Sequence, residues 1–471
     1  MTEEKKWITP TSLTRSAGCM HSFYLDCFGD RSEKRRETTA ERHVKSLGIS
    51  LQEKIVQGLP GIRGSRTSYA SMEEGARLTL TWMKEGVDWI YQGVLFRDDF
   101  SGIPDLLMKV PGRSALGDYT YVPGEVKSHK SPTFYDKLQL FHYAHLLEPV
   151  LGERPETGFV LAGSSANRYE IRLEGKIERQ FAELTRQMLL VRSGELATEP
   201  LRCSSCSRCL WSSRCQSEWL EKDHISLISG LSALMARKLT EQGLSNCAQM
   251  AEADASKLSE LLDIPVKHCQ RFILAARARQ ENRPIVLRKP EFPQGKTLYF
   301  YDIETNDDQV FCHGVVRVRN GQREEICFFA ENPGEEASIW HQLLDYLAVD
   351  EDLIVYCWTL YERTYVDICW RKFGGNRKGY DNLNRGLVDQ CAFVREHFAL
   401  PCRGYSIKAV APFFGFEWSS DEANGMNCVA WYRGWLETRD ESLREKIIQY
   451  NLDDVRAMAV VDERLKQLPP A

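Results

Sequence analysis

The sequence contains no long apolar run, no internal repeat and no low-complexity segment. No stretch approaches the roughly 18 consecutive apolar residues that a membrane-spanning helix needs. The first residues, MTEEKKWITPTSL, are charged and polar, and no apolar segment typical of a secretion signal follows them. These absences argue against membrane insertion and export, so we expect a cytoplasmic protein with no membrane partner.

The sequence also lacks a strongly basic overall charge and a glycine loop that binds nucleotide phosphates. A net charge of -5 argues against a uniformly basic surface, although it permits local basic patches such as residues 267–289. Without a nucleotide-binding loop, we expect these residues to contain no domain that hydrolyses nucleoside triphosphates.

The length of 471 residues and the hydrophobic share of 43% suit two or three domains. Helical and strand patterns mix over residues 1–220, and a helical stretch with few aromatic residues spans 224–284. Prolines and a glycine mark 285–296 as a linker, and strands then alternate with helices over 297–471. Since that alternation is typical of α/β domains, we predict an α/β protein with a small helical middle module.

Two predicted strands bring an acidic group together in the N-terminal region. The segments at 101–110 and 121–130 read as neighbouring strands separated by a turn-rich stretch. Because alternate residues of a strand share a face, Glu125 and Lys127 project together and Asp105 can reach them. Two carboxylates can hold Mg²⁺ or Mn²⁺, while a lysine orients water and offsets charge on a phosphate. An ordinary surface ion pair is the alternative.

Further motifs surround this acidic group. His43 lies in a predicted helix, and Gln139 and Tyr143 lie four residues apart on a helical face, suited to binding phosphate. A helical His, a GxxD strand, an ExK strand and a QxxxY helix, in this order, resemble the RecB-type branch of the PD-(D/E)xK nucleases. The resemblance implies a restriction-endonuclease-like core with metal ligands and a catalytic lysine at His43, Asp105, Glu125 and Lys127.

Fifteen cysteines are more consistent with free thiols and metal ligands than with disulfides in a reducing compartment. Four of them lie in CSSCSRCLWSSRC at 203–215, a spacing that suits a tetrahedral metal or an iron-sulfur cluster. Iron-sulfur members of the RecB-type family are similar: they have one cysteine in a CxxxFxLD-like segment and three more spaced CxxCx5C. The resemblance implies that the nuclease core is closed by a 4Fe-4S cluster on Cys19, Cys206, Cys209 and Cys215.

Alternatives remain for the metal and for its ligands. Zinc suits the same cysteine spacing. Cys203 adds a fourth nearby thiol that can replace Cys19, and Cys27 is a further candidate. A cluster with these ligands would join the two ends of the nuclease domain and stabilise it by restricting the unfolded chain.

A second acidic group is predicted near the C-terminus. The strand LYFYDIETN presents Asp302 and Glu304 on one face, and an amphipathic helix places Tyr450 one turn before Asp454. If the helix packs across the strand, three carboxylates and a phenol converge, and their repulsion has to be offset by cations. A solvated strand end and a plain helix surface are the alternatives.

These residues resemble the RNase H-like DEDD exonucleases, in the subclass that has a tyrosine. The resemblance implies two Mg²⁺ or Mn²⁺ ions held by Asp302, Glu304 and Asp454, with Tyr450 orienting the attacking water. Glu362 stands where the family has the remaining aspartate, which is a departure from the pattern, and Asp367 is the alternative ligand.

The whole order resembles a bacterial family in which an iron-sulfur RecB-like nuclease is fused to an RNase H-like exonuclease. It implies a metal-dependent deoxyribonuclease with two active sites that degrades single strands or ends, in DNA repair or in defence against foreign DNA. RNA is the alternative substrate, and we expect any unwinding of the nucleic acid to come from a separate helicase. The segment LISGLSALMARKLTEQGL also resembles a helix-hairpin-helix that binds phosphates, with a plain helical spacer as the alternative. Because Glu362 departs from the pattern, the alternative function is a nucleic-acid-binding scaffold with one active nuclease domain or none.

Overall fold

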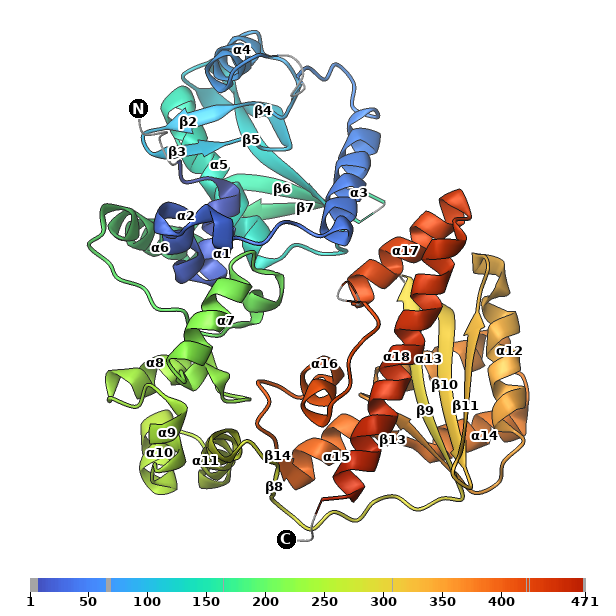
Figure 1. Ribbon diagram of the computed structural model, residues 1–471. Coiled ribbons are helices and arrows are strands. Elements are labelled where there is room, and N and C mark those ends of the chain that lie inside the picture. The colour runs from blue at the N-terminus through green and yellow to red at the C-terminus, as the bar shows by residue number, and fades with distance from the viewer. Residues whose placement is uncertain are drawn as a thin grey trace. The chain divides into compact units, whose positions relative to one another are not determined.

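Each of the two units of the chain, Met1–Gln216 and Ser217–Ala471, contains its own five-stranded sheet (Figure 1). The protein is therefore a mixed α/β protein, as predicted. None of the described helices combines the length and the apolar character that crossing a bilayer requires. The computed structural model describes residues 7–64, 69–163, 165–306, 308–420, 422 and 424–468.

The sheet of the first unit has the order β1-β4-β5-β6-β7. Its strands are β1 (Trp89–Tyr91), β4 (Leu106–Ser114), β5 (Gly117–Lys127), β6 (Thr157–Ala162) and β7 (Asn167–Arg172). Strand β4 is antiparallel to β5 with Leu106 opposite Gly124, whereas β5 is parallel to β6. The two strands expected to be neighbours are therefore paired, and β2 (Leu95–Arg97) and β3 (Phe100–Gly102) form a separate hairpin.

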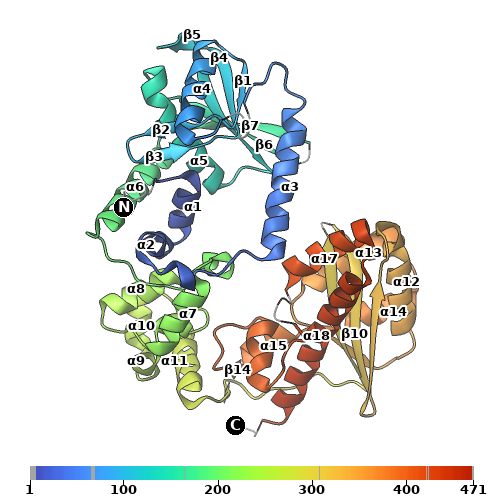
Figure 2. The same cartoon turned by 45° about the horizontal axis from the view of Figure 1, so that its top comes forward.

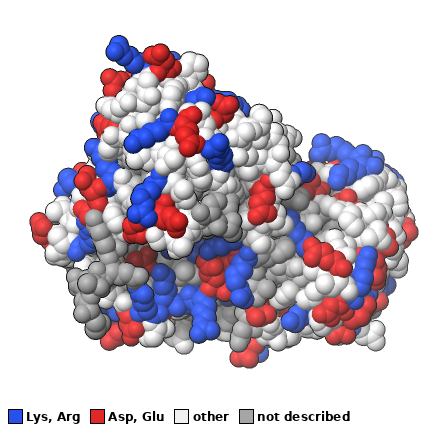
Figure 3. Space-filling view, turned by 90° about the horizontal axis from the view of Figure 1, so that it is seen from above, with Lys and Arg blue, Asp and Glu red and all other residues white. Residues whose placement is uncertain are grey.

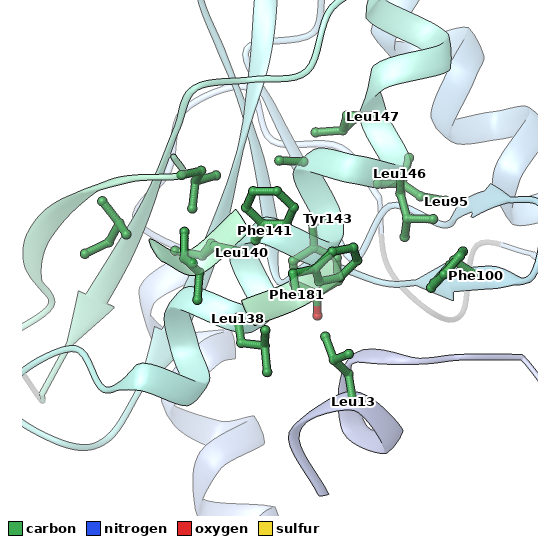
Figure 4. Close-up of a cluster of buried hydrophobic side chains, with 14 of the residues drawn as sticks. Leu13, Leu95, Phe100, Leu138, Leu140, Phe141, Tyr143, Leu146, Leu147 and Phe181 are labelled. Carbon is green, nitrogen blue, oxygen red and sulfur yellow. The ribbon is translucent and has the colours of Figure 1, made fainter. Parts of the chain in front are cut away.

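Helices α1 and α6 pack with α5 around the hydrophobic core of this unit. The core joins Leu13 of α1, Phe100 of β3, Phe141 and Tyr143 of α5, and Phe181 of α6 (Figure 4). A capping box on Thr133 begins α5, and Gly152 in the left-handed region ends it. The helices are α1 (Pro10–Gly18), α2 (Met20–Phe28), α3 (Thr39–Val56), α4 (Met72–Lys84), α5 (Phe134–Leu151) and α6 (Lys176–Ser193), and α7 (Ser212–Glu221) contains the boundary between the two units.

The second unit has a sheet of order β11-β10-β9-β12-β13. Strand β10 is antiparallel to β9 and β11, whereas β9, β12 and β13 run parallel to one another. Figures 1 and 2 show α18 lying along this sheet. The strands are β9 (Thr297–Asn306), β10 (Gln309–Arg319), β11 (Gln322–Phe329), β12 (Leu353–Cys357) and β13 (Leu387–Asp389).

Alternation along β9 decides which side chains meet α18 (Glu441–Lys466). Tyr301 and Ile303 share a core with Trp340 of α12 (Glu336–Leu347). Phe300, which points to the other face, packs in a core with residues of α18 such as Val455. Asp302 and Glu304 lie two and four residues after Phe300 and therefore share its face of the strand. The strand thus directs both carboxylates toward α18.

A β-bulge interrupts the pairing of β10 with β9. Val310 lies opposite Thr305, but Cys312 lies opposite Glu304, so Phe311 is one residue more than the partner strand provides. Because directly opposite residues share a face, Cys312 lies on the same face as Glu304.

The remaining helices of the second unit begin with a group of four, α8 (Ala233–Glu241), α9 (Cys247–Ala251), α10 (Ala255–Leu262) and α11 (Val266–Glu281). The predicted linker is partly a strand, because β8 (Ile285–Val286) pairs with β14 (Phe398–Ala399). The division into residues 1–220, 224–284, 285–296 and 297–471 stays a prediction. The other helices are α13 (Tyr361–Phe373), α14 (Arg377–Gly386), α15 (Gln390–His397), α16 (Ile407–Val410) and α17 (Gly425–Thr438).

The basic run at the end of the helical module is partly used inside that module. Arg277 Nε donates to the backbone oxygen of Ala251, and Arg279 lies 3.5 Å from a carboxylate oxygen of Asp223. On the face shown in Figure 3, Lys and Arg side chains lie among Asp and Glu side chains. This distribution agrees with the expectation that the surface is not uniformly basic.

Candidate active sites

Three carboxylates converge between β9 and α18. One oxygen each of Asp302, Glu304 and Asp454 lies within 4.8 Å of the other two. Glu304 and Asp454 are each 7% exposed, so solvent screens their charges poorly. The strand and the helix that the sequence singled out are therefore brought together by packing of α18 across the sheet.

Burial and mutual repulsion make this group receptive to a cation. Burial raises the pKa of Asp302 well above its ordinary value, and the neighbouring charges of Asp454 and Glu304 raise it further. Burial and the charge of Asp454 likewise raise the pKa of Glu304 well above its ordinary value. Clustered carboxylate oxygens are the ligands that Mg²⁺ and Mn²⁺ prefer, and such an ion would remove the repulsion. The residues present therefore fit a divalent metal.

Glu362 joins the group from the first turn of α13. Its side chain is 4% exposed and makes a hydrogen bond with Asp302, and burial raises its pKa to about 7. Its Oε2 atom is buried without a hydrogen-bond partner in the described part of the chain. A buried acceptor that lacks a donor fits a metal ligand. Asp367, the alternative, is exposed, and Asp389 caps α15 by accepting from the backbone N–H of Ala392.

Tyr450 of α18 places a phenol beside the carboxylates. It is 6% exposed, and its side chain makes a hydrogen bond with Asp454. Burial raises its pKa, and the charges of Asp454, Glu304 and Asp302 raise it further. The phenol therefore stays protonated near neutral pH and can donate a hydrogen bond.

Two further residues that the sequence patterns did not indicate contact Asp454. Trp418 Nε1 donates to Asp454 Oδ1 at 2.7 Å, and Lys408 Nζ lies 3.7 Å from the same oxygen. The Lys408 ammonium also lies 4.4 Å from the ring centre of Tyr450 and 4.6 Å from that of Trp418. Their distance from Asp454 along the chain follows no helix or strand period, so no spacing signal could have found them.

Asn451, also missed, fixes the position of Asp302. It is fully buried, and its Nδ2 donates to Asp302 Oδ2 at 2.8 Å. The backbone of Gly314 lies so close that a Cβ atom there would come within 1.9 Å of Asn451 Oδ1. An amide next to Tyr450 on the apolar face of a helix is a weak sequence signal for such a role.

The family comparison agrees with this geometry. Residues 299–466 match the RNase_H_2 family model, which is described as RNase_H superfamily. These residues therefore form an RNase H-like domain. Domains of this superfamily are metal-dependent nucleases that act on nucleic acids and use Mg²⁺ or Mn²⁺.

No curated protein matches the chain. Among solved structures, the crystal structure of SSO0001 covers 46% of this chain and 89% of its own length, at 14% identity and a TM-score of 0.22.

In the first unit, a second group forms around β4 and β5. Asp105 directly precedes β4, and its Oδ2 accepts from the backbone N–H of Val126 at 2.8 Å. Burial and the charge of Glu125 raise the pKa of Asp105 well above its ordinary value. Lys127 Nζ lies 2.5 Å from Glu125 Oε2. Although burial lowers the pKa of Lys127, the carboxylates of Glu125 and Asp105 outweigh that effect and raise it, so the ammonium stays charged.

Of the two residues of α5 that were expected at this site, Gln139 contacts this group and Tyr143 packs in the core. Gln139 Oε1 accepts from Lys127 Nζ at 2.9 Å, which places the amide beside the acidic residues. Tyr143 is 4% exposed, packs in the core, and its hydroxyl donates to the backbone oxygen of Ile103 at 3.3 Å. Asp136, which the sequence analysis missed, lies 4.0 Å from Lys127 Nζ at the start of the same helix.

Helix α3 reaches the same group through a residue other than the expected histidine. Gln52 Nε2 donates to Asp105 Oδ1 at 3.0 Å. His43 belongs to the same helix, but its side chain lies outside the described residues, so its role as a ligand stays a prediction.

Cys203 contacts two other cysteines, Cys19 and Cys206. Cys203 Sγ lies 3.7 Å from Cys206 Sγ and makes a hydrogen bond with Cys19. These two neighbours lower the pKa of Cys203, which makes it the most readily ionised of the three, and thiolates are the form that binds metals. Cys203, the alternative to Cys19 as fourth ligand, thus lies between Cys19 and Cys206. In the described part of the chain, no three of the cysteines have sulfurs within 4.8 Å of one another.

A cavity of about 350 Å³ lies beside these thiols. The residues that line it include Cys19, Cys209 and Arg15, together with Tyr135 and Gln139 of α5. The cavity therefore connects the cysteine segment with the residue that contacts Lys127.

Proposed function

We propose that the RNase H-like domain hydrolyses phosphodiester bonds with divalent ions held by Asp302, Glu304, Glu362 and Asp454. Bound Mg²⁺ or Mn²⁺ would polarise the phosphate and lower the pKa of the attacking water. Tyr450, kept protonated by its surroundings and bonded to Asp454, would orient this water through its hydroxyl group. The observation that carries the proposal is the approach of three carboxylate oxygens to within 4.8 Å of one another.

We further propose that the first unit is a RecB-like PD-(D/E)xK nuclease. Asp105 and Glu125 would hold a metal ion, with His43 as a third ligand. Lys127 would orient water and offset charge on the phosphate, and Gln139 would position the substrate, whereas Tyr143, expected to share that task, packs in the core. The support is the contact of Lys127 with both Glu125 and Gln139.

The cysteines of this unit would hold a 4Fe-4S cluster, or zinc, that stabilises its fold. The contact of Cys19 with Cys203 supports a metal site that joins the two ends of the unit. The expected ligands are Cys206, Cys209 and Cys215 with either Cys19 or Cys203. We propose DNA, as single strands or ends, as the substrate, in repair or in defence against foreign DNA.

Degradation of end-labelled DNA and RNA with Mg²⁺ or Mn²⁺ tests these proposals. Asp302→Asn and Asp105→Asn each remove one candidate metal ligand with little change in shape. If both sites work, each variant loses a separable part of the activity, and the label position gives the polarity of each site. If one variant has no effect, the corresponding unit is a binding platform.

Exposed carboxylates provide matched controls. Asp367 lies on the same helix as Glu362, α13, but is exposed to solvent. The Asp367→Asn variant should therefore retain full activity. Loss of activity in Asp367→Asn and not in Glu362→Gln would overturn the assignment of Glu362.

A further inference from the structure

Two thiols lie next to each other beneath the carboxylates of the RNase H-like domain. Cys312 Sγ on β10 and Cys327 Sγ on β11 are 2.8 Å apart. Gly314 lies opposite both Cys327 and Asp302, so these residues and Cys312 share the sheet face that meets α18. Cys312 is fully buried, whereas Cys327 is partly exposed.

The two thiols are linked to the proposed metal site through one amide. Cys312 Sγ donates to Asn451 Oδ1 at 3.2 Å, and Cys327 Sγ lies 3.9 Å from the same oxygen. The other end of that amide holds Asp302 Oδ2. The orientation of Asn451 therefore depends on thiol donors on one side and on a carboxylate acceptor on the other.

We propose that Cys312 and Cys327 form a reversible disulfide that controls the RNase H-like site, an inference whose regulatory part rests on the proposed nuclease function. The oxidant is a low-molecular-weight disulfide, RSSR. The partly exposed Cys327 sulfur attacks it, forming a mixed disulfide and releasing one RSH. The Cys312 sulfur then attacks the Cys327 sulfur and releases the second RSH. The two thiol hydrogens end on the two RSH molecules, so atoms and electrons balance.

The disulfide changes what Asn451 can bind. A disulfide sulfur carries no hydrogen, so Asn451 Oδ1 loses both of its thiol donors and becomes a buried acceptor without a partner. The bond also draws the sulfurs from 2.8 Å to about 2.05 Å. Any shift by which the buried amide regains a donor moves its Nδ2 away from Asp302 Oδ2, so Asp302 loses the donor that holds it in place.

The first test maps the disulfide in the full chain without any nuclease assay. The Asp105→Asn protein is incubated with oxidised glutathione, its remaining thiols are alkylated, and tryptic peptides are analysed by mass spectrometry. Trypsin cuts after Arg317, Arg319 and Arg323, so the two cysteines remain joined only through a disulfide. We expect the joined peptides in this protein and not in Asp105→Asn with Cys327→Ser. Their absence after oxidation would overturn the proposal.

The second test compares oxidised and reduced activity within each protein. Oxidation should lower metal-dependent cleavage in the Asp105→Asn protein about tenfold, the effect of losing one buried hydrogen bond. Dithiothreitol should restore the activity. Cys327→Ser keeps a hydroxyl donor near Asn451 and all the other thiols. In this variant the ratio of oxidised to reduced activity should stay near one. A mapped disulfide with unchanged activity would overturn the control of the site; a reduced protein without any nuclease activity would instead reject the proposed function.

Discussion

Trp418 and Asp454 are joined by a hydrogen bond of 2.7 Å from the indole Nε1 to carboxylate Oδ1. Trp418 follows the short helix α16, whereas Asp454 lies on α18, so the carboxylate is held from outside its own helix. A fixed carboxylate binds a metal ion without first losing side-chain freedom. The indole therefore positions a candidate metal ligand.

Trp418→Phe keeps the aromatic ring and removes the donor. We expect about tenfold lower kcat for the RNase H-like site, because one hydrogen bond to a charged group is lost, with little change in KM. Trp435→Phe is the matched control, since its buried indole donates to the backbone oxygen of Glu331, away from the carboxylates. Equal losses in both variants would attribute the effect to general destabilisation.

The raised pKa of Glu362 makes stability depend on pH. Its carboxyl has an ordinary pKa of 4.5 and one of about 7 in the fold, so the folded state binds more protons between these values. In metal-free protein this contribution falls as pH rises from 5 to 8. We expect the Tm of the parent minus that of Glu362→Gln to fall by a few degrees over this range. Saturating Mg²⁺ should reverse the trend.

The comparison with Glu362→Gln separates this effect from the buried histidines. Burial lowers the pKa of His142 to about 4 and that of His313 to about 3, and these groups favour the folded state as pH rises. Both histidines are present in both proteins and cancel in the difference. A pH-independent difference would show that Glu362 titrates alike in both states.

The ammonium of Lys127 offsets a buried carboxylate in the first unit. Glu125 is 3% exposed, so Lys127→Met leaves a buried charge without its partner and should destabilise this unit by about 3 kcal/mol. Adding Glu125→Gln should recover most of that loss in chemical denaturation. Lys45→Met, which breaks an exposed pair with Glu37, is the control and should cost less than about 1 kcal/mol.

Metal analysis of cysteine variants tests the cluster. In protein purified without oxygen, we expect Cys203→Ser to lose most bound iron or zinc, because its sulfur contacts those of Cys19 and Cys206. Cys402→Ser, in the other unit, should retain the metal content of the parent. Elemental analysis per chain measures this, and full retention by Cys203→Ser would leave Cys19 as the fourth ligand.

Local periods were enough to predict the elements that carry the carboxylates. Alternation placed Asp302 and Glu304 on one strand face, and the helical period placed Tyr450 next to Asp454. Local periods did not separate Glu362 from Asp367. The family resemblance favoured Glu362, and packing shows that Glu362 is the buried one of the two.

Contacts between distant segments were beyond sequence reasoning. Lys408 and Trp418 reach Asp454 from a segment without a regular period, and Gln52 reaches Asp105 from a helix whose expected ligand was His43. Such contacts depend on how elements pack, which one sequence does not specify at the level of single side chains.

The bulge at Phe311 fixes the register of β10 against β9, the strand that carries Asp302 and Glu304. If Phe311 paired with Glu304 and the strands continued without a bulge, Cys312 would lie opposite Ile303 and leave the face of α18. His313 would then lie opposite Asp302 and bring an imidazole among the carboxylates. The bulge thus decides which of two neighbouring side chains, a thiol or a metal-binding ring, lies on the face of the acidic residues, without altering any of those residues.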